Sequence, residues 1–302
     1  MIELNLPDHF THTVSKTFTG GREWLKQLPA LLAETAARWS LTIGAPFAEL
    51  SYNLVLPARR RDGAELILKI GVPNAELEAE IRALAYWDGR VTVRLLDADP
   101  TWGVLLLERL RPGRMVSTLP DDDALRVTAE LMRALWQQPP AAHSFVSVAD
   151  WAGGLARLRA EFGGGTGPFA PHLVALAEAY FAALLPSMAA PVLLHGDLHQ
   201  YNILAGERRP WLIIDPKGVI GEPAYEIGPF MRNCLPENGS ATEIIRLQAR
   251  RLDMFSEMLD LDRERLRMWC VAQQVLSAWW SYEDTGLDYL DSMALAALLT
   301  NV

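Results

Sequence analysis

The chain changes texture abruptly at Arg111-Pro112-Gly113, and this break constrains the fold more than any other feature of the sequence. Before it, residues 46–110 read as short apolar strand-like segments around one helical pattern. After it, Ala/Leu-rich segments with helical spacing dominate. Proline followed by glycine marks a turn or loop between such regions. We therefore predict an α+β protein with two lobes, in which residues 1–110 form a small β-rich lobe and residues 111–302 a larger, mostly helical one.

The first lobe is predicted to contain a sheet and accompanying helices. Its apolar segments are separated by turn residues, and the Asp62-Gly63 dipeptide between two of them is a strong hairpin signal. Apolar residues spaced by three and four positions predict helices, and Asp88-Gly89 is a glycine stop for one of them. The predicted strands are residues 48–56, 65–70, 91–96 and 103–108, and the predicted helices are residues 24–36 and 75–87.

The second lobe is predicted to be helical apart from one β-rich island at Val192–Ile220. Within the island, residues 202–204 and 211–214 form a predicted hairpin that leads to Asp215. The glycine-rich run at 163–168 lacks a following Lys-Ser/Thr, so we expect a loop and not a phosphate-binding site there. The predicted helices are residues 122–136, 151–161, 171–185, 242–259 and 262–280.

The composition excludes several classes of function. A formal net charge of −9 argues against binding nucleic acid, which needs a surplus of Lys and Arg, whereas it permits a cationic small substrate. No segment approaches the ~20 uninterrupted apolar residues of a membrane span, and the first residues lack a secretory signal. Two cysteines are too few for a disulfide framework. We expect a cytoplasmic monomer or weak dimer that binds neither nucleic acid nor membrane.

The island places polar side chains where its apolar strands stop, first at His195-Gly196-Asp197 and again at Asp215. Asp197 and Asn202 have the Asp-x-x-x-x-Asn spacing of the protein-kinase catalytic loop, and Asp215 follows the next strand. Phosphoryl transfer needs a base for the attacking hydroxyl and a divalent metal on the phosphates, and Mg²⁺ prefers oxygen ligands. We therefore predict Asp197 as the base and Asn202 and Asp215 as Mg²⁺ ligands. His195 is expected to bond the loop backbone.

A lysine lies inside an apolar strand of the first lobe, at Lys69. Because an unpaired buried ammonium is costly, Lys69 needs a carboxylate or a ligand, unless it lies on the solvated face of an edge strand. The following helix offers Glu76, Glu78 and Glu80 as partners. A Lys–Glu pair that holds the α- and β-phosphates is the kinase arrangement, so the first lobe is predicted to bind ATP.

The remaining nucleotide contacts follow weaker signals. A glycine-rich phosphate loop is missing from the first lobe, which departs from the protein kinases. Its place is taken by Glu49–Asn53, where Ser51, Asn53 and backbone N–H groups are candidates for phosphate contacts. The last strand of the lobe leads toward the second lobe, and the backbone of Glu108 and Leu110 is predicted to contact the adenine.

Together these motifs resemble the aminoglycoside and hydroxyurea phosphotransferase family, most closely its streptomycin 6-phosphotransferase branch. The His-Gly-Asp-Leu-His block is shared by many small-molecule kinases, whereas Asp-Pro-Lys-Gly is more specific to this branch. The resemblance implies a protein-kinase-like fold, ATP, Mg²⁺ and an aminoglycoside hydroxyl as acceptor. It also implies that Lys69 contacts phosphate and that Glu80 is its partner, although spacing alone does not exclude Glu76. The matching segments are residues 51–53, 66–70, 86–90, 94–100, 105–110, 193–204, 214–218 and 277–281.

The resemblance further implies a cationic acceptor, because streptomycin bears guanidinium groups. A guanidinium site should display carboxylates in a partly desolvated cleft, where charge pairs are stronger than in water. The candidates are Glu283 and Asp284, at the end of a predicted helix, together with Glu226. The tryptophans that precede Glu283 are also compatible with the core, and Glu226 with an internal ion pair to Arg232 or another base.

Three other functions fit parts of the pattern. A kinase that acts on another hydroxylated metabolite would share every ATP-side residue. The series His195-x-Asp197-x-His199 offers zinc-ligand types, but a zinc hydrolase would lack a second histidine cluster and would leave Lys69 unexplained. A nucleotide-binding protein without catalysis would not need the complete set of base, metal ligands and phosphate lysine.

Overall fold

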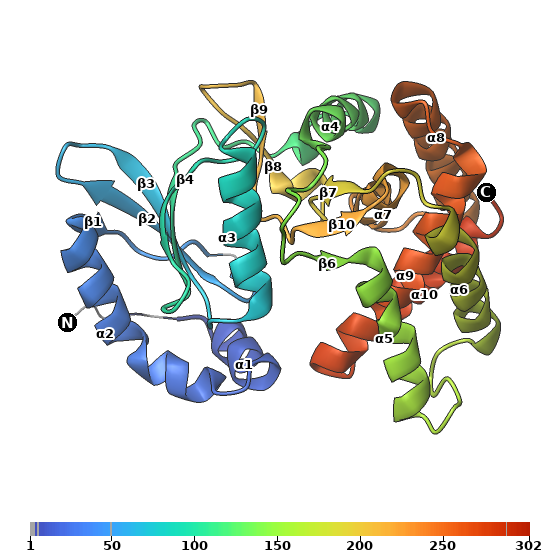
Figure 1. Ribbon diagram of the computed structural model, residues 1–302, viewed down its shortest axis with the longest axis horizontal. Helices are drawn as coiled ribbons and strands as arrows, with labels where there is room; N and C mark the ends of the chain where they lie inside the picture. Colours follow the sequence, from blue (N-terminus) through green and yellow to red (C-terminus); the bar gives the residue numbers. More distant parts are fainter. Residues whose placement is uncertain (1–3, 5, 49, 288) are drawn as a thin grey trace. The chain divides into compact units, whose positions relative to one another are not determined.

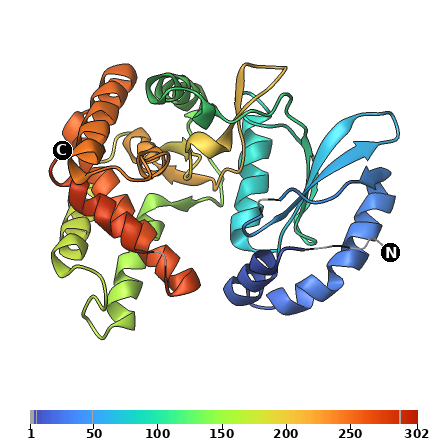
Figure 2. The same ribbon diagram turned by 180° about the vertical axis from the view of Figure 1, so that it is seen from behind.

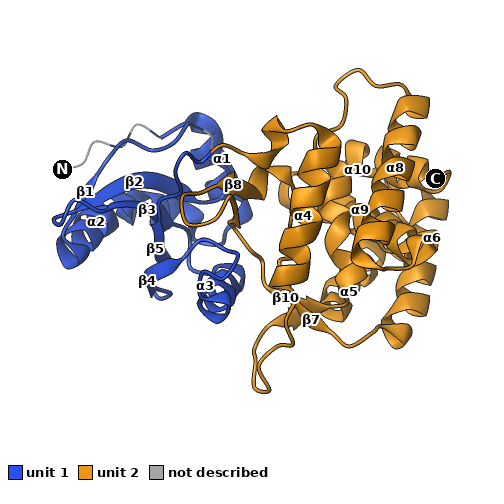
Figure 3. Cartoon of the chain, turned by 90° about the horizontal axis from the view of Figure 1, so that it is seen from above, with its two compact units in different colours: residues 1–113 blue, residues 114–302 orange. Residues whose placement is uncertain are grey.

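The computed structural model describes residue 4 and residues 6–48, 50–287 and 289–302. It divides into two compact units, residues 1–113 and residues 114–302 (Figure 3). The boundary predicted after residue 110 lies just before this division, and Glu49 of the predicted phosphate segment lies outside the described residues. Among the described residues, no helix is both long and apolar enough to cross a membrane.

Unit 1 is built on a five-stranded sheet with the order β1-β2-β3-β5-β4 and antiparallel neighbours throughout (Figure 1). The hairpin predicted at Asp62-Gly63 joins β2 to β3, with Arg59 opposite Glu65 and Gly63 at a φ of +88°. Glycine adopts this left-handed conformation without steric cost. The strands are β1 (Leu41–Ile43), β2 (Leu54–Arg60), β3 (Glu65–Ile70), β4 (Leu95–Asp99) and β5 (Val104–Glu108).

The helices of unit 1 are α1 (Asp8–Thr17), α2 (Gly21–Trp39) and α3 (Ala75–Trp87). Buried apolar residues of α1 and α2 form one core with those of β2 and β3. Helix α3 lies against the sheet on the opposite side from α2, as Figures 1 and 2 show from the front and from behind. It begins after Asn74, whose side chain accepts a hydrogen bond from the Leu77 N–H at 2.9 Å, and ends at the predicted Asp88-Gly89 stop.

Two strand predictions in unit 1 were misplaced. The strand predicted from residue 48 starts only at Leu54, because residues 51–53 form bends. The strand predicted at 91–96 is observed at Leu95–Asp99. Val91 and Val93 are nearly inaccessible to solvent without belonging to the strand, so their apolar character reflected burial and not pairing. Helix α1 was not predicted, since its polar residues outnumber its two buried ones, Phe10 and Val14.

Unit 2 consists largely of helices that surround the long helix α9, which is buried along most of its length. The five predicted helices are confirmed, although α9 continues to Thr285, beyond the predicted end at Trp280. Two further helices were missed, because α7 is a single turn around Gly228-Pro229 and α10 is too uniformly apolar to show a helical period. The helices are α4 (Asp121–Leu135), α5 (Val148–Glu161), α6 (Pro171–Leu184), α7 (Gly228–Arg232), α8 (Ala241–Leu259), α9 (Arg263–Thr285) and α10 (Leu290–Leu299).

The predicted β-rich island is confirmed and carries the residues of chemical interest. Strand β7 (Val192–Leu194) pairs with β10 (Val219–Gly221), which also pairs with β6 (Val146–Ser147). Strands β8 (Ile203–Ala205) and β9 (Trp211–Ile213) form the predicted hairpin. Short 3-10 turns lie at Val116–Thr118, Leu185–Ser187, Gln200–Asn202 and Pro223–Ile227. Asp197 thus follows β7, and Asp215 follows β9.

Candidate active site

His195 opens the loop between β7 and β8 and is fully buried. Its Nδ1 accepts a hydrogen bond from the Asp197 N–H at 3.1 Å, so its Nε2 carries the proton and donates to the Ile214 carbonyl at 2.8 Å. Burial lowers the pKa of His195 to about 4, because the charged imidazolium would lose its hydration. His195 therefore stays neutral and fixes the loop, as predicted, and both of its nitrogens are occupied by backbone.

Glu226 packs against the same loop, and its position disagrees with the predicted contact with the acceptor. Its side chain is fully buried, and its two carboxylate oxygens accept the N–H groups of His195 and Gly196 at 2.7 and 2.8 Å. Burial raises the pKa of Glu226 to about 8, although the two N–H donors favour its charged form. The carboxylate is thus committed to the loop backbone. We withdraw the predicted contact with the acceptor and assign Glu226 to holding the loop.

Asp197 is held by a residue that the sequence had suggested as a partner for Glu226. Arg232, at the end of α7, donates to Asp197 Oδ1 at 2.5 Å, and His199 Nε2 lies 3.8 Å from Oδ2. Burial alone would raise the pKa of the Asp197 carboxyl, but the positive charge of Arg232 and smaller effects of His199 and Lys217 lower it below its ordinary value. Asp197 is therefore ionised at neutral pH, and a quarter of its side chain remains exposed.

Asn202 and Asp215 are brought together by the β8–β9 hairpin. The Asn202 amide donates to the Asp197 carbonyl at 3.0 Å, and the Ile214 N–H donates to the Asn202 carbonyl at 2.9 Å. Asp215 follows with a φ of +57°, a left-handed conformation that costs energy for a residue other than glycine. Backbone strain of this kind is common at functional sites.

The oxygen atoms at this point suit a magnesium ion. One amide oxygen and one carboxylate form the kind of small protein donor set that Mg²⁺ uses when substrate phosphates supply further ligands. Within the described residues, no group of three or more His, Cys, Asp or Glu side chains gathers as a metal cage. The side chains of Asn202 and Asp215 therefore fit Mg²⁺ bound together with phosphate.

Lys69 and Glu80 form a buried ion pair inside unit 1. The Lys69 ammonium donates to both carboxylate oxygens of Glu80 at 2.7 Å, and the two residues are 4% and 6% exposed. Glu76 is exposed, and Glu78 pairs with Arg82 on the surface of α3 at 3.4 Å. Of the three glutamates that the sequence left open, Glu80 is thus the partner of Lys69.

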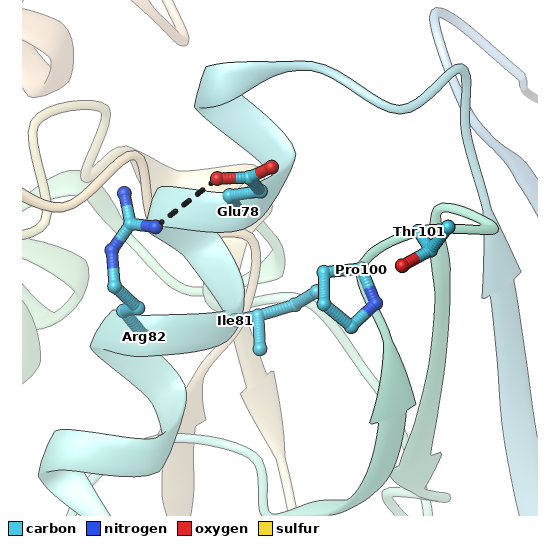
Figure 4. A pocket seen from close by; sticks show the side chains of 5 residues that line it. All are labelled: Glu78, Ile81, Arg82, Pro100 and Thr101. Carbon is cyan, nitrogen blue, oxygen red and sulfur yellow. Dashed lines mark hydrogen bonds and ion pairs between the residues drawn. The ribbon is translucent and has the colours of Figure 1, made fainter.

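A pocket between α3 and the turn after β4 does not include this pair. It is lined by Glu78, Ile81 and Arg82 of α3 and by Pro100 and Thr101 of the turn after β4 (Figure 4). The dashed line in Figure 4 marks the Glu78–Arg82 pair at its rim. Because neither Lys69 nor Glu80 lines this pocket, we assign it no part in phosphate binding.

The other residues predicted to contact the nucleotide lie next to the ends of β2 and β5. Ser51 is exposed, and Asn53 lies over the segment after β3, where a Cβ on Gly71 would come within 2.0 Å of Asn53 Oδ1. The Glu108 N–H donates a hydrogen bond to the Arg94 carbonyl at 3.1 Å, so this donor is not available to an adenine. The contact of the Glu108 carbonyl and the Leu110 backbone with adenine stays a prediction.

The two late carboxylates lie on the last turn of α9. Glu283 receives both Nε and Nη2 of Arg157 from α5, at 2.9 and 3.0 Å, so its charge is already paired. Asp284 is partly buried next to it. Trp279 is 3% exposed and belongs to the core, whereas Trp280 is partly exposed.

Three comparisons relate this chain to known proteins. The model of the family described as aminoglycoside/hydroxyurea antibiotic resistance kinase matches residues 38–285. The streptomycin 6-kinase of Streptomyces glaucescens is 34% identical over 305 residues, which cover 97% of this chain and 95% of that protein. The hydroxyurea phosphotransferase of Kitasatospora aureofaciens is 38% identical over 274 residues, covering 87% and 76%.

Among solved structures, a choline kinase from Streptococcus pneumoniae superposes with a TM-score of 0.68 at 14% identity. The match covers 91% of this chain and all of that one. At this identity the likeness concerns the fold alone, and it confirms the predicted protein-kinase-like architecture.

Proposed function

Because the chain belongs to the aminoglycoside/hydroxyurea antibiotic resistance kinase family, we propose that it transfers the γ-phosphoryl group of ATP to a hydroxyl of streptomycin. The family assignment confirms the resemblance deduced from the motifs, and it makes the protein a phosphotransferase. The observation that supports this chemistry best is the anchored, ionised Asp197 beside Asn202 and the strained Asp215.

Asp197 would orient and deprotonate the attacking hydroxyl. Arg232 occupies Oδ1, so Oδ2 is the oxygen that accepts the hydroxyl proton. The hydroxyl oxygen forms a bond to the γ-phosphorus as the bond from that phosphorus to the bridging oxygen breaks, and ADP leaves. A carboxylate with a lowered pKa is a weak base, which suits a loose transition state in which the proton moves late. Positioning is therefore the main contribution of Asp197.

The remaining residues would bind the nucleotide. Lys69, fixed by Glu80, contacts the α- and β-phosphates, and Ser51 and Asn53 are candidates for further phosphate contacts. Asn202 and Asp215 would hold Mg²⁺, which neutralises charge on the phosphates when it is bound.

Hydroxyurea is a second candidate acceptor, and two observations favour it. The hydroxyurea phosphotransferase is 38% identical to this chain, and the expected cation-binding carboxylate Glu283 is already paired with Arg157. A zinc hydrolase is not supported, because both ring nitrogens of His195 are engaged by backbone groups.

ATP consumption in the presence of different acceptors tests the proposal. Purified protein with Mg-ATP is offered streptomycin, other aminoglycosides, hydroxyurea and common hydroxylated amines. We expect strong stimulation by streptomycin. If only hydroxyurea stimulates ATP consumption, the protein is a kinase whose acceptor is hydroxyurea and not streptomycin. If no acceptor stimulates it, the proposed reaction is refuted.

A further inference from the structure

Two tryptophans of unit 2 contact each other, and one of them, Trp151, packs on the catalytic loop. A Cβ placed on Gly196, the residue before Asp197, would come within 2.7 Å of the Trp151 ring, so this ring packs directly on the loop backbone. Trp151 is in the first turn of α5, and Trp280 is near the end of α9. Their ring centroids are 5.3 Å apart, and the ring planes are nearly perpendicular at 81°.

These rings are less buried than the neighbouring aromatic core, which Trp151 contacts through Tyr225 at a centroid distance of 6.1 Å. Both are partly exposed, whereas the neighbouring Trp279 is 3% exposed and packs among Phe162, Phe169 and Tyr282. Consecutive residues of an α-helix point about 100° apart, so Trp280 leaves the face that Trp279 buries.

A glycine allows the two helices to meet at this point. A Cβ on Gly154 of α5 would come within 2.7 Å of Leu276 and 3.5 Å of the Trp280 Nε1. One turn further along each helix, Arg157 and Glu283 form an ion pair between α5 and α9. The contacts between α5 and α9 therefore extend from Trp151, next to the catalytic loop, to the carboxylate of Glu283.

Two perpendicular indoles form a corner whose ring faces are rich in π electrons, which attracts a flat cation. A guanidinium is planar, weakly hydrated and stacks well on aromatic faces. We propose that the corner formed by Trp151 and Trp280 binds a guanidinium-type group of the acceptor and thereby holds the acceptor beside Asp197. This inference rests on the proposed function, since it names the site that would read the positive charge of the substrate.

Isothermal titration with streptomycin tests the corner without requiring turnover. Trp280→Ala should weaken binding by about threefold to thirtyfold, the range of a cation–π contact. Trp280→Leu keeps apolar bulk but no ring and should weaken binding similarly, whereas Trp280→Phe should retain most of the affinity. Trp39→Ala removes a partly exposed tryptophan that packs on the core of unit 1 and should leave the streptomycin affinity unchanged. Thermal unfolding and the KM for ATP establish that each variant is folded.

The outcomes separate the two proposals. Unchanged streptomycin affinity in Trp280→Ala and Trp280→Leu, or no binding by the unmodified protein, would overturn the corner. If Trp280→Ala does not fold, the comparison of Trp280→Leu with Trp280→Phe decides in the same way. Binding without phosphorylation would overturn the proposed function and leave the corner intact.

Discussion

The ion pair of unit 1 and the catalytic loop of unit 2 hold their charges by different means. Lys69 and Glu80 lie on a strand and a helix and neutralise each other in a nearly dry environment. Asp197 lies on an irregular loop, where it is placed by Arg232, Asn202 and the buried carboxylate of Glu226. The first arrangement is centred on one ion pair between a strand and a helix, whereas the second combines several contacts, some of them far apart in sequence.

A buried ion pair is costly to break, because either partner left alone keeps its desolvation penalty. The loop distributes its anchoring over several hydrogen bonds, so the loss of one contact should displace the base without unfolding the unit. Substitutions in unit 1 should therefore affect stability first, and those in the loop should affect turnover first.

The largest effect on turnover is expected from Asp197→Ala. Loss of a positioned base should lower kcat by about 10²–10⁴-fold, while the KM for ATP changes little. Steady-state kinetics at saturating acceptor measure both values. Turnover within about tenfold of the unmodified protein would show that Asp197 is not the base.

Lys69→Met should act mainly on stability. It leaves the buried Glu80 carboxylate without its lysine partner, which costs about 3–5 kcal/mol in the free energy of unfolding. The double variant Lys69→Met/Glu80→Leu removes both charges and should recover much of this loss, although ATP binding stays impaired. Urea unfolding monitors both variants, and equal losses in the two would contradict the ion-pair account.

Arg232→Gln should change the pH dependence of activity. Removing this cation favours the protonated form of Asp197, so its pKa rises and a smaller fraction is ionised at any acid pH. The acid limb of the kcat/KM profile should therefore move to higher pH. A profile that keeps its acid limb while kcat falls would assign Arg232 a purely structural role.

Glu226→Gln should loosen the loop. The amide offers one acceptor oxygen to the two N–H donors of His195 and Gly196, and a buried donor left without an acceptor costs about 1–3 kcal/mol. We expect kcat to fall more than the KM for ATP rises. Glu237→Gln, at an exposed position, is the matched control and should leave both unchanged.

The smallest effect is expected from Arg157→Gln. This arginine pairs with Glu283 at a largely exposed site, where an ion pair contributes at most about 1 kcal/mol. If Glu283 binds the cationic acceptor, releasing it should lower the acceptor KM by up to about fivefold. A higher KM would indicate that Arg157 itself supports the acceptor site.

Local patterns sufficed for much of the fold and for part of the site. The β2–β3 hairpin, α3 and the long helices follow from turn residues, a glycine stop and apolar spacing, all of which are local. Lys69 was noticeable because a charge inside an apolar strand needs a partner, and Asp197 with Asn202 because their spacing is short. Spacing alone left three glutamates on one helix open, the family resemblance singled out Glu80, and the structure shows that pair.

Contacts between distant segments could not be predicted in this way. Arg232 meets Asp197 across 35 residues, and Glu226 reaches the His195 N–H across 31. A glutamate in the sequence looks the same whether it faces solvent or backbone donors, which is why Glu226 was assigned to the acceptor. Trp151 carried no signal, since its importance comes from its contact with Gly196.

The most direct test of the central claim is to follow the label of γ-labelled ATP during incubation with Mg²⁺, streptomycin and the protein. We expect the label to appear on the antibiotic in equal amount to the ADP formed, and to do so far more slowly with Asp197→Ala. Label found only as inorganic phosphate, or transferred equally fast by Asp197→Ala, would contradict an aspartate-directed transfer to an acceptor hydroxyl.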